Sequence, residues 1–163
     1  MRLWLAFAVC LLGSVAVAQE TGVAFGGFDY DQSEPVEITA DSLDVNQSDG
    51  TATFEGSVII GQGGLRLSAD KVRVEYGDGE NGQTEIKRLL ATGNVTLVST
   101  DEAAEADSAV YSVVDGTIAL AGSVLVTQGP AAISGDRLTV NLETGDGAIE
   151  GNVKTVLTSG SDQ

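Results

Sequence analysis

Apolar and polar residues alternate along most of the chain, in short runs separated by turn residues. Runs such as Val36-Glu37-Ile38 and Val72-Arg73-Val74-Glu75-Tyr76 put every second side chain on the same side of an extended backbone. Asp49-Gly50, Gly77-Asp78-Gly79 and Asp115-Gly116 lie between such runs and are typical of hairpin turns. No window of a dozen residues keeps the 3.6-residue period of an amphipathic helix. The pattern predicts an all-β fold.

One sequence unit occurs four times: an Asp before alternating apolar residues, a turn, and then Gly-Ser or Gly-Asn before a Val. The paired residues are Asp41 and Gly56, Asp70 and Gly93, Asp107 and Gly122, and Asp136 and Gly151. They are 15 residues apart except in the second unit, where they are 23 apart and residues 77–84 hold the surplus. One unit cannot bury its apolar face alone, so the units must pack together. We expect a sandwich or roll of roughly a dozen or more short strands.

Residues of one parity are predicted to face the interior of this fold. The parity set is Leu43, Val45, Phe54, Val58, Ile60, Leu67, Val72, Val74, Tyr76, Val95, Leu97 and Leu120. The opposite parity contains Asp44, Glu55, Ser57, Lys71, Arg73 and Glu75, which we expect to face solvent. An interior of medium-sized aliphatic side chains fits either an ordinary dry core or an apolar channel that admits alkyl chains. Parity alone favours the dry core.

The N-terminus resembles a signal peptide. Met1-Arg2 precedes an apolar run from Leu3 to Leu12, and Ala16-Val17-Ala18 is a small-x-small cleavage pattern. The segment is shorter than the roughly 20 apolar residues of a membrane-spanning helix. We therefore expect a signal peptide at 1–18, a flexible lead at 19–34, one domain at 35–158 and a tail at 159–163. The alternative is an uncleaved membrane anchor.

Composition excludes several kinds of chemistry. Cys10 is the only cysteine and lies in the predicted signal peptide, and the chain has no histidine, so thiol chemistry and the usual general base are missing. A net charge of -16 disfavours binding to nucleic acid. Gly61-Gln62-Gly63-Gly64 lacks the Lys and helix of a phosphate-binding loop and is interpreted as a hairpin turn. The once-per-repeat aspartates suit a turn or capping role better than catalysis. We expect no enzyme activity, no cofactor and no metal site.

The repeats resemble those of the LptA (OstA-like) periplasmic lipopolysaccharide-transport family. The resemblance rests on Pro35-Val36-Glu37-Ile38-Thr39-Ala40-Asp41, on Thr53-Phe54-Glu55-Gly56-Ser57-Val58, on Ala69-Asp70-Lys71-Val72 and on the unit that begins at Asp136. It extends over residues 35–157. The chain departs from the family in its acidity, its lack of histidine and its short C-terminal tail.

The resemblance implies an open, V-shaped β-jellyroll that holds lipid A acyl chains in an apolar groove. It implies a periplasmic carrier that passes lipopolysaccharide from the inner to the outer membrane. The expected partners are an LptC-like inner-membrane protein, an LptD-like outer-membrane translocon, and further copies of the chain joined end to end. By position, Val36, Ile38, Phe54 and Tyr111 match the family's entrance strand and cavity lining. Parity adds Leu43, Val45, Val58, Ile60, Leu67, Val72, Val74, Val95, Leu97 and Leu120 as lipid-binding residues.

The resemblance also assigns edge-to-edge assembly to the first and last strands of the domain. These edge residues are Val36, Glu37, Ile38, Thr39, Val153, Lys154, Thr155, Val156 and Leu157. Pairing along an exposed strand edge uses main-chain hydrogen bonds for affinity and alternate side chains for register. Terminal strands that fold back to cap their own sheet are the alternative. Two other identities stay open: an LptC-like, membrane-anchored member of the same superfamily, and a structural or adhesive β-repeat protein.

Overall fold

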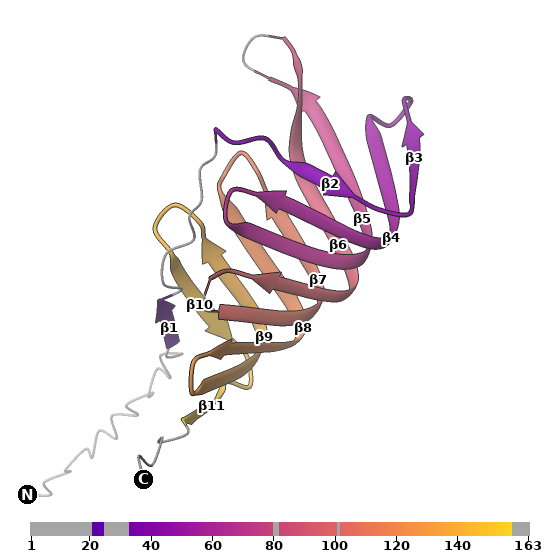
Figure 1. The fold of residues 1–163 in the computed structure, drawn as a ribbon. Helices are drawn as coiled ribbons and strands as arrows, with labels where there is room; N and C mark the ends of the chain where they lie inside the picture. The colour runs from indigo at the N-terminus through magenta and orange to yellow at the C-terminus, as the bar shows by residue number, and fades with distance from the viewer. Residues whose placement is uncertain (1–20, 25–32, 80–81, 101, 158–163) are drawn as a thin grey trace, which may run out of the picture.

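The computed structural model describes residues 21–24, 33–79, 82–100 and 102–157, so the predicted signal peptide and C-terminal tail lie outside the described residues. The described residues form eleven strands (Figure 1). The strands are β1 (Thr21–Ala24), β2 (Glu37–Thr39), β3 (Ser42–Asn46), β4 (Thr51–Gln62), β5 (Leu65–Asp78), β6 (Thr84–Val98), β7 (Glu102–Ser112), β8 (Thr117–Gln128), β9 (Ala131–Asn141), β10 (Asp146–Glu150) and β11 (Lys154–Leu157). The described part of the chain contains no helix that is long and apolar enough to span a bilayer.

All strands belong to one antiparallel sheet in which chain neighbours pair from β4 to β10. β2 and β3 both pair with β4, and β10 and β11 both pair with β9. Each pair acts as one strand broken in the middle, so one broken strand lies at each end of the sheet. β1 adds a further strand beside β10. The sheet does not close into a barrel, and its two ends remain apart (Figure 1).

The long strands bend near their middles, and the sheet therefore folds into two layers. At each bend the pairing register shifts, as between Glu55 and Val58 on β4 and between Ala121 and Val124 on β8. Layer A contains residues 21–24, 42–55, 70–79, 82–92, 107–121 and 136–150. Layer B contains residues 37–39, 58–69, 95–100, 102–106, 124–135 and 154–157. A bulge inserts a residue, increases the local twist and lets one strand continue round a corner.

The apolar interior consists of rows of inward-facing side chains that run across neighbouring paired strands. One row of layer A runs through Phe54, Val72, Ala91, Ala109, Leu120, Leu138 and Ile149, which are paired in register. A row of layer B runs through Ile60, Leu67, Leu97, Ala104, Val126 and Ile133. Most of these side chains are less than 3% exposed. The interior is therefore filled by the protein's own side chains, as the parity pattern alone favoured.

Three details differ from the sequence prediction. The strands are fewer and longer than expected, and six of them have 11 to 15 residues, because the bulges let a strand pass a corner without ending. Thr21–Ala24, placed in the flexible lead by its lack of apolar periodicity, forms β1 by main-chain pairing with β10. The sequence predicts a hairpin turn at Gly61-Gln62-Gly63-Gly64, but β4 continues through Gly61 and Gln62, and the turn contains only Gly63 and Gly64.

Candidate functional site

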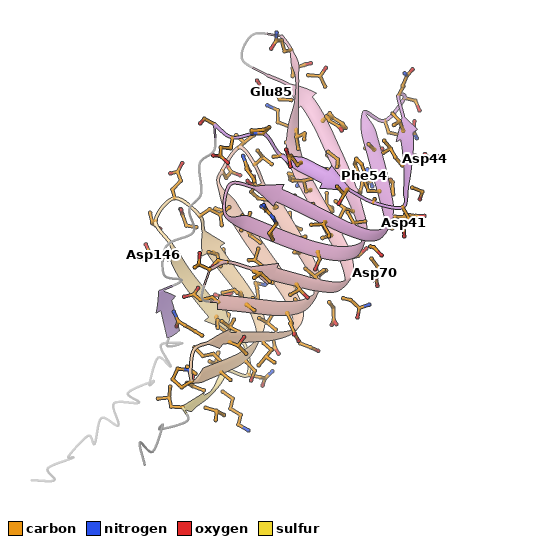
Figure 2. The ribbon with its side chains drawn as sticks, in the orientation of Figure 1. Asp41, Asp44, Phe54, Asp70, Glu85 and Asp146 are labelled. Atoms are coloured by element: carbon orange, nitrogen blue, oxygen red, sulfur yellow. The ribbon has the colours of Figure 1, made fainter. Side chains whose placement is uncertain are left out.

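The four repeated aspartates lie at the corners of the folded sheet. Each one packs against the corner glycine of the neighbouring strand, in the pairs that the repeat defines. A Cβ on Gly122 would lie 2.8 Å from Asp107 Cβ and would overlap its carboxylate. Figure 2 shows Asp41 and Asp70 beside the bend of the strands, with Glu85 far from it. The aspartates are thus parts of the architecture, which is the turn or capping role expected from their periodicity.

The residue after each corner glycine also has a left-handed backbone. Gly56, Gly93, Gly122 and Gly151 have φ values from 75° to 83°, and the residue that follows each of them has a φ value from 45° to 49°. Asn94 Nδ2 donates to Asp70 Oδ2 over 2.7 Å, and Asn152 Nδ2 donates to Asp136 Oδ2 over 2.8 Å. Asn tolerates this conformation better than most residues. The Gly-Ser and Gly-Asn pairs of the sequence repeat therefore mark the corners that create two facing layers.

Most residues predicted to line a lipid site share the interior. Nine of the fourteen are at most 2% exposed: Val58, Ile60, Leu67, Val72, Val74, Val95, Leu97, Tyr111 and Leu120. Val36, Ile38 and Phe54 are partly buried and pack against this core. The structure thus brings twelve of the predicted residues together on facing surfaces of the two layers. Their role in lipid binding stays a prediction.

Leu43 and Val45 are the exceptions, because they are 55% and 60% exposed. They occupy the correct rows, since Leu43 pairs with Phe54 and Val45 with Ala52. Parity identifies the face of a strand, but it does not show whether another element covers that face. The hairpin of β3 and β4 projects at one end of the sheet (Figure 1), and Tyr76, also predicted to face inward, is 38% exposed.

The predicted assembly strands are the terminal strands of the sheet. Among the described strands, β2 pairs only with β4, and β11 pairs only with β9. Each therefore has one edge without a strand beside it. Apolar side chains are exposed near both ends of the sheet: Leu43 and Val45 at one end, and Val156 (49%) and Leu157 (74%) at the other. Exposed apolar groups beside a free strand edge are typical of an interaction surface.

The two layers meet again opposite the corners, along a line that we name the seam. Layer B reaches the seam at the paired ends of β4 and β5, of β6 and β7, and of β8 and β9. Layer A reaches it at the paired ends of β5 and β6, of β7 and β8, and of β9 and β10. A pocket of about 440 Å³ lies on the seam between Val36 and Gln62 of one side and Ile86, Val113 and Val114 of the other. Pockets of this size are in the range that binds small ligands.

Gln62 is the residue at this pocket that sequence reasoning missed. It is only 2% exposed, and its Nε2 donates to the Glu34 carbonyl over 2.9 Å. Its Oε1 accepts a hydrogen bond from the Tyr111 hydroxyl. Since Gln62 belongs to layer B and Tyr111 to layer A, this bond joins the two layers. The alternation along the strand could have identified Gln62 as an inward-facing residue, because it lies two residues after the inward-facing Ile60.

Charged side chains lie mainly on the outer surface. Lys71 and Glu55 form an ion pair of 2.7 Å, and so do Arg88 and Glu75. Within the described ranges, no group of three or more acidic, cysteine or histidine side chains is arranged to hold a metal ion. The structural feature that remains for function is therefore an apolar interior between two layers, flanked by two free strand edges.

A folded, open-ended antiparallel sheet with an apolar interior defines the class of open β-jellyroll proteins. The chain belongs to the LptA/(LptD N-terminal domain) LPS transport protein family, whose profile matches residues 37–146, more than half of the chain. This is a family of transport proteins and not of enzymes, which confirms that expectation and the predicted family resemblance.

Individual relatives agree with this assignment. The chain is 28% identical over 145 residues to an uncharacterized protein of Rhizobium meliloti (strain 1021), which covers 86% of this chain and 78% of the relative. It is 26% identical over 112 residues to the lipopolysaccharide export system protein LptA of Escherichia coli (strain K12). That match covers 67% of this chain and 60% of LptA.

A solved structure has the same fold. It is the crystal structure of LptH from Pseudomonas aeruginosa, described as the LptA-homologous periplasmic component of a conserved lipopolysaccharide transport device. The TM-score is 0.66 at 17% sequence identity, and the match covers 79% of this chain and 99% of LptH. The predicted all-β, open jellyroll is therefore confirmed.

Proposed function

We propose that this chain is a periplasmic lipopolysaccharide carrier that holds lipid A acyl chains between its two layers and passes the lipid towards the outer membrane. The observation that carries the proposal is the continuous apolar interior of a sheet that is open at both ends. Burial of one methylene group contributes roughly 0.8 kcal/mol, so half of a ~14-carbon chain contributes about 5 to 6 kcal/mol before ordering costs. Several acyl chains per lipid therefore supply affinity without a charged anchor.

The acidic surface is compatible with this cargo if the lipid head group stays in solvent. The net charge of -16 disfavours close contact between an anionic head group and the protein surface. Acyl chains can enter the interior while the sugars and phosphates remain hydrated. Divalent cations would reduce the repulsion. We expect lipopolysaccharide binding to strengthen with added Mg²⁺, and binding of an uncharged alkyl probe to be unaffected.

End-to-end assembly is the second part of the proposal. The free edge of β2 would pair with the free edge of β11 on the next copy, and the same edges would meet an LptC-like protein at one end and an LptD-like translocon at the other. A heterologous contact of this kind produces open-ended chains instead of a closed dimer. Leu43 and Val45 on one copy and Leu157 on the next would lose apolar exposure in such a contact.

Two measurements on the purified full mature chain test the two parts separately. Lipopolysaccharide should co-purify with the chain or bind it in a filter or calorimetric assay, and complete absence of binding with and without Mg²⁺ would contradict the carrier function. Sedimentation velocity should show an average mass that increases with protein concentration and with salt, because salt screens the repulsion between acidic copies. A mass that stays that of the monomer at all concentrations would contradict self-association.

A further inference from the structure

The interior is filled by the protein's own side chains in this structure, so an acyl chain needs a way in. Core residues such as Ile60, Leu120 and Val140 are at most 1% exposed, so the layers must move apart before a chain can lie between them. The corners cannot supply this opening, because the main chain of six strands continues through them. The seam is the side on which no strand connects the two layers.

Buried polar side chains are concentrated at this seam. Among the described residues, two polar or charged side chains are as buried as the apolar core. They are Gln62, which is 2% exposed, and Glu102, which is 6% exposed. Both lie at the hairpin ends of layer B strands, on β4 and β7. Glu102 accepts a hydrogen bond from Gln128 within layer B, whereas Gln62 is bonded to Tyr111 across the seam. The seam therefore differs chemically from the rest of the interior.

This composition makes the seam easier to open than an apolar contact would be. Separating two apolar surfaces exposes them to water at the full hydrophobic cost. Separating a hydrogen-bonded pair lets water replace each partner, so the net cost of the lost bond is only about 1 kcal/mol. Gln62 itself lines the pocket, together with four apolar residues and three charged ones: Val36, Ile86, Val113, Val114, Glu34, Glu85 and Lys87. Val36, Ile86 and Val113 also pack against the apolar core.

We propose that the hydrogen bond between Tyr111 and Gln62 is a latch that holds the two layers closed at the seam, and that its release admits an acyl chain through the adjoining pocket. The proposal rests on the carrier function for the identity of the ligand, but the latch itself concerns the two layers alone. Gln62 also donates to the Glu34 carbonyl, so the latch ties the segment before β2 to both layers. An acyl chain in the pocket would contact Val36 and Ile86, and it would lie beside Gln62.

The proposed latch predicts that a single variant opens the seam and that a double variant closes it again. Tyr111→Phe keeps the ring but removes the hydroxyl that donates to the side-chain oxygen Oε1 of Gln62 in the closed state. Because the closed state loses this hydrogen bond, the variant favours the open state. The ratio of open to closed molecules should rise about five-fold, the equivalent of about 1 kcal/mol. Gln62→Met combined with Tyr111→Phe removes both side-chain partners of this bond at nearly constant shape, which is often neutral or stabilising. The Glu34 carbonyl also loses its Gln62 donor, but Glu34 is an exposed residue, so water can replace that donor. The double variant should therefore return to the closed state.

Spin labels on the two layers measure this opening without any lipid. Cysteines at Ile59 of layer B and Val110 of layer A, both on the outer surface, carry the labels in a chain with Cys10→Ser, and pulsed electron resonance gives their distance distribution. The long-distance population should increase in Tyr111→Phe and fall back in the double variant. Ser112→Ala is the matched control, because it removes an exposed hydrogen bond to Asp115 from the next residue of the same strand.

Binding of purified lipopolysaccharide and of a spin-labelled stearate completes the test. If closed molecules dominate, apparent affinity is proportional to the open fraction, so Tyr111→Phe should bind about five-fold more tightly than the parent chain. Unchanged distances in Tyr111→Phe, or a double variant that opens further, would overturn the latch even if the parent chain binds lipid. The expected distances without lipid binding in any variant would support the latch and overturn the carrier function instead.

Discussion

Replacement of a corner glycine by alanine should destabilise the fold through two separable effects, and Gly122→Ala is the clearest case. Gly122 has a φ of +83°, a region that costs an L-residue roughly 1 to 2 kcal/mol. The new Cβ would also overlap the Asp107 carboxylate and would lie 2.8 Å from Asp107 Cβ. Overpacking of this kind costs about 1 to 3 kcal/mol. The expected loss in the free energy of unfolding is therefore about 2 to 5 kcal/mol.

Gly129→Ala supplies a matched control for the backbone part. Gly129 also has a positive φ, +52°, but no atom lies within 4 Å of a Cβ at that position. The Gly129→Ala variant should therefore lose only about 1 to 2 kcal/mol in the free energy of unfolding. Urea unfolding followed by far-ultraviolet circular dichroism gives the loss in the free energy of unfolding for both variants. In thermal unfolding, the midpoint temperature should fall by about 2 to 4 °C for each kcal/mol lost. Equal losses in the two variants would refute the claim that the aspartate packs against the corner.

Four further outcomes are expected. Leu120→Ala, at a fully buried position, should cost about 2 to 5 kcal/mol in the free energy of unfolding measured in urea. Leu43→Ala should cost less than about 1 kcal/mol, because that side chain is 55% exposed. A large loss at Leu43 in dilute solution would contradict the uncovered hairpin. At Asn94, whose φ is +45°, Ala should be more destabilising than Gly, since both lose the bond to the corner aspartate but only Gly relieves the backbone; the reverse order would count against the corner geometry. Arg88→Ala removes an exposed ion pair and should change stability by less than about 1 kcal/mol, an effect that 0.5 M salt should reduce further. Mass spectrometry of the exported protein should find Gln19 at the N-terminus, and retention of residues 1–18 would favour a membrane-anchored member of the superfamily.

Parity predicted much of the interior because strand geometry fixes it locally. Val72 and Val95 face inward since each lies two residues from another inward residue on a strand of alternating pattern, and both are at most 1% exposed. The spacing between Asp107 and Gly122 likewise predicted a repeated architectural role. These features depend on residues close together in sequence or on a period that the sequence displays directly.

Long-range contacts were beyond such reasoning. Leu43 occupies the expected row but is exposed, because burial depends on whether the opposite layer extends far enough to cover it. The bond between Gln62 and Tyr111 joins residues 49 positions apart, and nothing local in the sequence pairs them. Pairing of β1 with β10 joins the first strand of the described chain to the tenth. Each of these features follows from how the layers face each other, which alternation within a strand does not specify.

The most direct test of the carrier function is a photo-crosslinking residue at Phe54 in the exported protein, with Glu55 as the control. Phe54 packs against the apolar interior, whereas the neighbouring Glu55 lies on the outer surface in an ion pair with Lys71. Ultraviolet light should produce an adduct that reacts with anti-lipopolysaccharide antibody at Phe54 and not at Glu55. No adduct at Phe54, nor at Val36 or Tyr111, in cells with active lipopolysaccharide transport would contradict the account.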